Sequence, residues 1–152
     1  MAYKAVPAKR KAQKGVHVML HLLALLAGIL GTYVIFKFKH ESVGALNMKT
    51  LHSWLGIITI SLYGLQWVFA FFAYCFPGAE RIAKATLLPW HIFFGMVIFF
   101  FAILTAEIVL AQTFIFFVKR LNSEGYIVNF TGLLILLYAI SVTLTVILPR
   151  RY

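Results

Sequence analysis

The stretch "TLLPWHIFFGMVIFFFAIL", residues 86–104, decides the fold class of this chain. It is a continuous apolar run close to the roughly 20 residues that a helix needs to cross the hydrocarbon core of a bilayer. One ionisable side chain interrupts it, His91, directly after Pro89 and Trp90. Ionisable residues inside membrane segments are functional candidates by default. The role of His91 is therefore inferred below from its position relative to the other histidines.

Composition places the whole chain in the membrane class. Of its 152 residues, 62% are hydrophobic and 12% are charged, and the mean hydropathy is +0.93. A soluble domain of this size leaves too much surface exposed to hide so many apolar side chains. Backbone polar groups in lipid must be bonded within their own segment, so we predict an all-α bundle of transmembrane helices. The four expected helices span about 16–36, 51–76, 86–110 and 126–148.

The basic residues predict how the helices are oriented. Four spans place both termini on one side, together with nine of the lysines and arginines, against five on the other side. This positive-inside bias predicts that both termini are cytoplasmic. We expect a basic cytoplasmic segment at 1–15 and a single transmembrane domain at 16–149, without a cleavable signal peptide. The formal charge of +10 follows from this topology, so nucleic-acid binding is not expected.

The alternating helix directions sort the histidines into two layers. His17 and His21 lie at the cytoplasmic start of the first helix, and His91 lies at the cytoplasmic start of the third. His52 begins the second helix at the outer face, and His40 lies in the loop just outside the first helix. Imidazole is a good metal ligand, and bundle cores are common places for cofactor sites. Two imidazoles on separate helices suit the two axial positions of a haem iron.

A repeated spacing strengthens the haem hypothesis. His52-x-x-x-Gly56 and His91-x-x-x-Gly95 place a glycine on the same helix face as each histidine. Without a side chain there, a flat macrocycle can approach the backbone. The alternative is that histidines mark helix ends at the interface and that glycines serve helix packing alone. Zinc or copper is disfavoured because the single cysteine, Cys75, and the scattered acids do not complete a four-ligand set.

Four motifs give the chain a family resemblance. In this order and spacing, "KGVHVMLH", "LHSWLG", "LLPWHIFFG" and "GYIVNFTGLLIL" resemble the cytochrome b561 family, and most closely its plant members. These transmembrane b-type cytochromes pass electrons from cytoplasmic ascorbate across a membrane. The resemblance covers nearly the whole chain and implies a six-helix fold, two b-type haems, usually a homodimer, and a vacuolar or vesicle membrane.

The resemblance also assigns haem ligands by motif. His17 and His91 match both axial ligands of the inner haem, and His52 matches one ligand of the outer haem. The family's other outer ligand sits in a His-Pro motif on an earlier helix, whereas "MAYKAVP" resembles only the end of that helix. We therefore expect the first helix and most of the second to be missing, with one haem completely ligated. A second haem would need a substitute such as His40, although the family links a histidine near this place to the outer substrate site.

Further residues are expected beside the haems. His21 shares a face with His17, so it either competes as a ligand or packs and hydrogen-bonds beside the inner haem. Trp54 and Trp90 flank the ligand histidines and either border a haem or anchor the helix ends at the interface. Glu107 is the one acid inside a predicted helix, and it either reaches the interface by snorkelling or relays protons.

Basic residues predict a substrate site at the cytoplasmic face. Arg10, Lys14, Arg81 and Lys84 precede His17 and His91 in the chain, where they would attract an anionic reductant. The resemblance implies that basic residues here contact ascorbate, most firmly Lys14 and Lys84. The alternative is plain positive-inside charge. On the outer side, His40 and Lys39 are candidates for holding the electron acceptor.

The sequence thus predicts a transmembrane ascorbate-dependent oxidoreductase. Electrons would pass from cytoplasmic ascorbate through b-type haem to monodehydroascorbate or a ferric chelate. Two alternatives stay open. One is a haem-deficient truncated form with a structural or dimer-modulating role, which the missing His-Pro helix favours. The other is a haem-anchoring subunit of a larger membrane dehydrogenase, against which the basic residues near His17 favour a small anionic donor.

Overall fold

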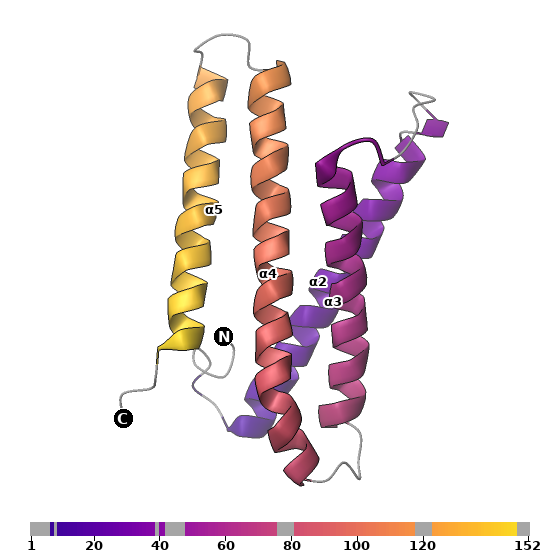
Figure 1. Ribbon diagram of the computed structural model, residues 1–152, viewed down its shortest axis with the longest axis vertical. Helices are drawn as coiled ribbons and strands as arrows, with labels where there is room; N and C mark the ends of the chain where they lie inside the picture. Colours follow the sequence, from indigo (N-terminus) through magenta and orange to yellow (C-terminus); the bar gives the residue numbers. More distant parts are fainter. Residues whose placement is uncertain are drawn as a thin grey trace.

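The computed structural model describes residues 7, 9–38, 40–41, 48–75, 81–117 and 123–148, without the side chains of Arg81 and Phe117. These residues form four α-helices and no strand, which confirms the predicted fold class. In Figure 1 the helices α3, α4 and α5 stand nearly upright, and α2 crosses behind α3 at a slant. Their bounds are α2 Arg10–Phe38, α3 Leu51–Cys75, α4 Arg81–Phe117 and α5 Ser123–Ile147.

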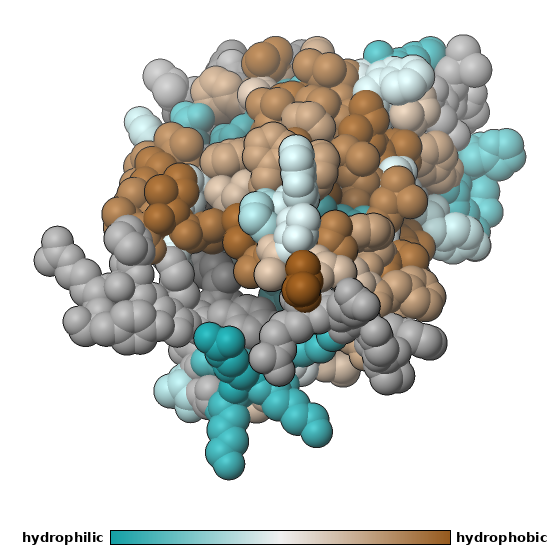
Figure 2. Space-filling view, turned by 60° about the horizontal axis from the view of Figure 1, so that its bottom comes forward, coloured by the Kyte–Doolittle hydropathy of each residue, from teal (hydrophilic) through white to brown (hydrophobic). Residues whose placement is uncertain are grey.

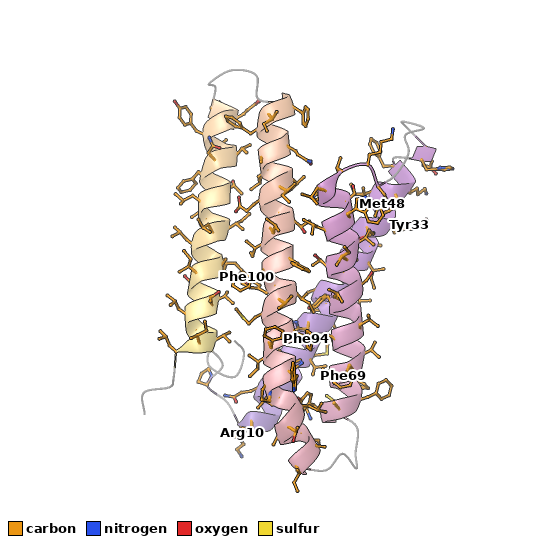
Figure 3. The ribbon with its side chains drawn as sticks, in the orientation of Figure 1. Arg10, Tyr33, Met48, Phe69, Phe94 and Phe100 are labelled. Carbon is orange, nitrogen blue, oxygen red and sulfur yellow. The ribbon has the colours of Figure 1, made fainter. Side chains whose placement is uncertain are left out.

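Each of the four helices is long and apolar enough to cross a membrane. Few side chains are buried within the bundle, and the buried apolar residues among those described are Leu25, Ile98, Ala139 and Val142. Large apolar side chains point outward instead, as Tyr33 and Phe69 do in Figure 3. Figure 2 shows the resulting brown, hydrophobic face, with hydrophilic residues toward its edges. Such a surface is suited to lipid rather than water.

Two helices extend well beyond their predicted bounds. α2 begins at Arg10, inside the segment that we predicted to precede it, and α4 runs from Arg81 to Phe117. At 37 residues, α4 is about 55 Å long, against roughly 30 Å of hydrocarbon. The predicted bounds came from charge-free stretches of sequence, which mark only the part of a helix that must lie in lipid. Lysine and arginine are good helix formers, and they prolong the helix into the interface.

Local hydrogen bonds fix the start of α3, where His52 lies. The Thr50 hydroxyl accepts the backbone N–H of Ser53 at 3.2 Å, and the Thr50 carbonyl accepts that of Trp54 at 3.2 Å. Thr50 is therefore the N-cap of α3. Met48, with a left-handed φ of 68°, lies just before this cap. The cap places His52 in the first turn, at the end of the helix that the sequence assigns to the outer face.

The extensive helix contacts join consecutive helices, and the most extensive is between α3 and α4. Small residues allow α2 and α3 to approach where they cross. A Cβ on Gly28 would lie 2.5 Å from Cδ1 of Ile60, and one on Gly64 would lie 3.7 Å from Cδ1 of Leu25. Helices in membranes commonly pack through such small residues. Here they bring the histidine-bearing start of α2 beside α3.

Proline shapes the N-terminal end of α4. Pro89 lies inside this helix, where it has no N–H to donate and its ring conflicts with the carbonyl four residues earlier. Figure 1 shows the N-terminal end of α4 leaning away from the axis of the rest of the helix. A helix kink of this kind is commonly caused by proline. His91 therefore lies at the bend.

Candidate haem site between the helices

A cluster of three histidines lies where α2 and α4 approach. The ring centroids of His17 and His91 are 6.3 Å apart, and the two rings are nearly perpendicular at 81°. The ring of His21 lies 4.3 Å from that of His17. The structure thus brings together the three histidines that the sequence places in one cytoplasmic layer, although they come from helices distant in the chain.

The spacing of His17 and His91 fits two ligands of one metal. Imidazole nitrogen binds a metal ion at about 2.0–2.1 Å and the ring centre lies roughly 1 Å behind it, so two axial rings have centroids about 6 Å apart. The observed 6.3 Å agrees with this distance. Nδ1 of His91 is buried and has no hydrogen-bond partner in the described part of the chain. The centroid distance is compatible with axial ligation of an iron by His17 and His91, and the ligation itself stays a prediction.

His21 is held by α3 through a tyrosine that the sequence analysis missed. Nδ1 of His21 lies 2.7 Å from the Tyr63 hydroxyl, which in turn donates to the His21 carbonyl at 3.0 Å. Both bonds form together when Nδ1 carries the proton and donates it to the hydroxyl oxygen. His21 therefore lies beside His17, with one ring nitrogen committed to α3. The signal for Tyr63 was a polar aromatic residue inside an apolar run.

Three more residues lie around His17, His21 and His91, and together these six residues form the inner layer. The Tyr74 ring lies 5.5 Å from that of His91, and its buried hydroxyl has no partner among the described residues. Lys14 donates from Nζ to the Tyr74 carbonyl. Gln66 donates from Nε2 to the His91 carbonyl at 3.0 Å. Sequence reasoning selected Lys14 for its charge but missed Tyr74 and Gln66, because nothing in the sequence shows which way they point.

The other predicted substrate residues make no described contact with the inner layer. Lys84 is half-buried and Arg10 is exposed, and the side chain of Arg81 is outside the described part. At the opposite end His40 is exposed, whereas Lys39 lies outside the described residues. The structure therefore brings Lys14 alone of these residues into a described contact with the inner layer.

His52, at the opposite end of α3, is oriented by α4. Its Nδ1–H donates to the carbonyl oxygen of Thr105 at 3.1 Å, since a carbonyl can only accept. The proton on Nδ1 leaves Nε2 with a lone pair. Metal-binding histidines commonly donate their second nitrogen to a backbone carbonyl in this way. The ring of His52 is therefore in the tautomer that can bind a metal through Nε2.

Protein atoms lie opposite Gly56 and Gly95, the two glycines that we predicted to leave room for a macrocycle. A Cβ on Gly95 would lie 3.1 Å from Nε2 of Gln66, and a Cβ on Gly56 would lie 3.7 Å from Cγ2 of Thr105. Both glycines are thus at the α3–α4 contact, and their role in admitting a macrocycle stays a prediction. Trp54 and Trp90 are exposed, and Trp90 stacks on Phe94 at 6.1 Å. Their placement beside a haem also stays a prediction.

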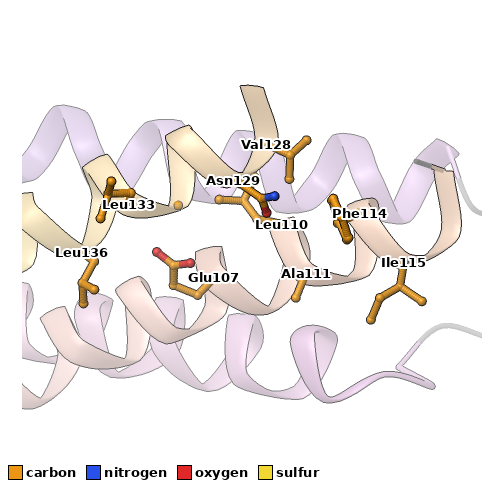
Figure 4. A pocket seen from close by; sticks show the side chains of 10 residues that line it. Glu107, Leu110, Ala111, Phe114, Ile115, Val128, Asn129, Leu133 and Leu136 are labelled. Carbon is orange, nitrogen blue, oxygen red and sulfur yellow. The ribbon is translucent and has the colours of Figure 1, made fainter. Parts of the chain in front are cut away.

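A second polar feature lies between α4 and α5. Glu107 points toward α5 into a cavity of about 530 Å³, together with Asn129 (Figure 4). Oε2 of Glu107 would be 3.0 Å from a Cβ on Gly132, and the buried Oε1 has no partner among the described residues. The missing side chain of Gly132 therefore makes room for this carboxyl. Snorkelling and proton relay both stay predictions for Glu107.

Comparison with known proteins identifies the family. A family model described as eukaryotic cytochrome b561 matches residues 1–117. The chain is 41% identical over 156 residues to "Probable ascorbate-specific transmembrane electron transporter 1" of Oryza sativa subsp. japonica, an alignment that covers 99% of this chain and 66% of that protein. It is 36% identical to "Transmembrane ascorbate ferrireductase 1" of Arabidopsis thaliana, over 95% of this chain and 62% of that protein.

These alignments run almost end to end in this chain, but the chain spans about two thirds of the length of the relatives that it matches. With four apolar helices and this family match, it is a multi-pass integral membrane protein. The match also accounts for the histidine motifs from which the resemblance was first inferred. The chain belongs to the eukaryotic cytochrome b561 family.

Proposed function

We propose that this chain carries electrons across a membrane, from cytoplasmic ascorbate to monodehydroascorbate or a ferric chelate on the other side. The observation that carries the proposal is the pair His17 and His91, whose nearly perpendicular rings come from two helices and have centroids 6.3 Å apart. The names of the relatives support it, since they describe those proteins as ascorbate-specific electron transporters and ascorbate ferrireductases. The chain would thus be a transmembrane ascorbate-dependent oxidoreductase.

We propose b-type haem as the cofactor, in keeping with the family. His17 and His91 would hold the inner haem, and His52 would supply one ligand of the outer haem. The haem iron supplies one-electron redox chemistry, with a potential tuned by its axial ligands and by burial. One haem has a complete ligand pair in this chain, and a second would require a substitute ligand such as His40.

The protein residues near the inner layer have distinct tasks in this proposal. Lys14 is bonded to the Tyr74 carbonyl and keeps two further N–H donors, because an ammonium group carries three. Its charge therefore lies at the backbone of Tyr74, whose ring centroid is 5.5 Å from that of His91. Together with Lys84 it would attract the ascorbate anion and raise its local concentration. Tyr63 would hold His21, which in turn packs against the ligand His17.

The orientation and assembly of the chain are also proposals. We propose that both termini face the cytoplasm, on the strength of the nine-to-five distribution of basic residues. A homodimer in a vacuolar or vesicle membrane is proposed from the family resemblance. Protease protection in sealed vesicles with a tag at each terminus would test the orientation.

A spectroscopic count of haem tests the proposed function. We would purify the full chain in detergent, record ascorbate-reduced minus oxidised spectra, and measure haem per chain as the pyridine haemochrome. We expect one ascorbate-reducible haem per chain, which His91→Ala abolishes and His40→Ala leaves in place. Two haems per chain, falling to one in His40→Ala, would show that the outer site finds its substitute ligand. A chain without haem would overturn the electron-carrier proposal and leave the structural alternative.

A further inference from the structure

The helices α3 and α4 carry the same pattern of residues in opposite directions. α3 has His52, a glycine four residues later, and Gln66 fourteen residues later. α4 repeats this spacing with His91, a glycine four residues later, and Thr105. Because the two helices are antiparallel, the last residue of each pattern lies beside the histidine of the other helix. Gln66 donates to the His91 carbonyl, and His52 donates to the Thr105 carbonyl.

The two ends of this pattern differ in how closely the helices approach. At Gly95, a Cβ would lie 3.1 Å from Nε2 of Gln66, which is closer than side-chain carbons ordinarily come. At Gly56, a Cβ would lie 3.7 Å from Cγ2 of Thr105, which is ordinary van der Waals contact. An added methyl group would therefore press on the amide of Gln66 but would be accommodated beside Thr105. A Cβ at residue 95 would therefore require the amide that donates to the His91 carbonyl to shift.

The position of this hydrogen bond suggests what it does. Pro89, two residues before His91, removes a backbone donor from the turn where α4 bends. The backbone that carries His91 is therefore less constrained by its own helix than in an uninterrupted turn. Gln66 adds a bond from α3 to the carbonyl of that residue, at 3.0 Å. This bond fixes the backbone of His91 relative to α3 at the bend.

We propose that Gln66 is a positioning residue for the inner haem site and that Gly95 serves to admit its amide. The inference rests on the proposed function, since it treats His91 as an axial ligand. Without the Gln66 bond, the His91 ring would change its angle to the His17 ring, and the electronic environment of the iron would change with it. A substitution at Gly95 would then act through Gln66 rather than by filling space that a macrocycle needs.

A double-mutant cycle tests this proposal in the full chain loaded with haem. The variants are Gly95→Ala, Gln66→Met and the two combined, with Gly31→Ala as the control, because a Cβ on Gly31 would have no described atom within 4 Å. Methionine has nearly the same length as glutamine but donates no hydrogen bond. The readouts are the low-spin electron paramagnetic resonance signal and the midpoint potential of the inner haem. We expect both single variants to shift these values in the same direction, the double variant to shift them no further, and the control to leave them unchanged.

Two results would overturn the proposal. If the effects of Gly95→Ala and Gln66→Met simply add, Gly95 serves something other than the amide, such as clearance for the haem. If Gln66→Met leaves the signal and the potential unchanged, Gln66 has no positioning role. Thermal unfolding of the same chains without haem keeps this test separate from the proposed function. In the chains without haem, Gly95→Ala should destabilise the parent chain more than the Gln66→Met chain. Equal destabilisation of both would contradict the role of the Gln66 hydrogen bond even if no haem binds.

Discussion

Removing one hydroxyl should loosen α2 from α3 by a predictable amount. The Tyr63 hydroxyl makes two hydrogen bonds to His21, at 2.7 Å to Nδ1 and at 3.0 Å to the carbonyl oxygen. Hydrogen bonds between membrane helices contribute about 0.6 kcal/mol each on average, and up to about 1.7 kcal/mol. Tyr63→Phe keeps the ring and deletes both bonds, so we expect the free energy of unfolding to fall by about 1–2 kcal/mol. A change of that size is close to a tenfold change in the unfolding equilibrium.

The assay is reversible unfolding of the purified chain by increasing detergent denaturant, followed by tryptophan fluorescence. Tyr33→Phe is the matched control on α2, because Tyr33 is 61% exposed and has no hydrogen bond among the described residues. It should change the free energy of unfolding by much less. The decisive comparison is His21→Ala in both backgrounds. Its destabilising effect should shrink when Tyr63 is already Phe, and strictly additive effects would refute the bonded pair.

Three further outcomes follow from the site. Lys14→Ala and Lys84→Ala should each slow haem reduction by ascorbate about fivefold at low salt, since one charge pair near contact is worth about 1 kcal/mol in a high dielectric. Stopped-flow rates that are unchanged, or that change equally for a neutral reductant, would remove the anion-binding hypothesis. If the haem count is two per chain, His52→Ala should leave reduction of the inner haem intact but abolish electron transfer to an impermeant ferric chelate outside ascorbate-loaded vesicles. Persistence of that transfer would exclude His52 from the route. Glu107→Met should raise the free energy of unfolding by about 1–3 kcal/mol, because it replaces a buried oxygen without a partner. A lower stability would mean that the carboxyl has a partner outside the described residues.

Sequence alone predicted the helices and the histidine layer because both follow from coarse physical quantities. Lipid-length apolar runs fix how many helices there are, and their alternating directions fix the depth of every residue. Two residues near the N-terminal ends of odd-numbered spans must therefore lie at a similar depth. The 6.3 Å between His17 and His91 is consistent with that reasoning.

The contacts within each layer could not be predicted from the sequence. In a helix that is apolar on every side, periodicity does not show which face meets protein and which meets lipid. Tyr63, Gln66 and Tyr74 all lie on α3, and only the packed structure shows that Tyr63 bonds to α2 while Gln66 bonds to α4. For Gly95 the sequence did not reveal the amide of Gln66 that lies opposite it.

The order of helix packing bears on how the chain is made. Among the described residues, the extensive contacts join each helix to the next one in the chain, α2 to α3, α3 to α4, and α4 to α5. Each helix leaving the ribosome can thus dock on a neighbour that is already in the bilayer, without waiting for a distant partner. Contacts between sequence neighbours close short loops and form quickly. The exception is the His17–His91 pair, which can form only after α4 has entered, so the cofactor site would be the last part of the inner layer to assemble.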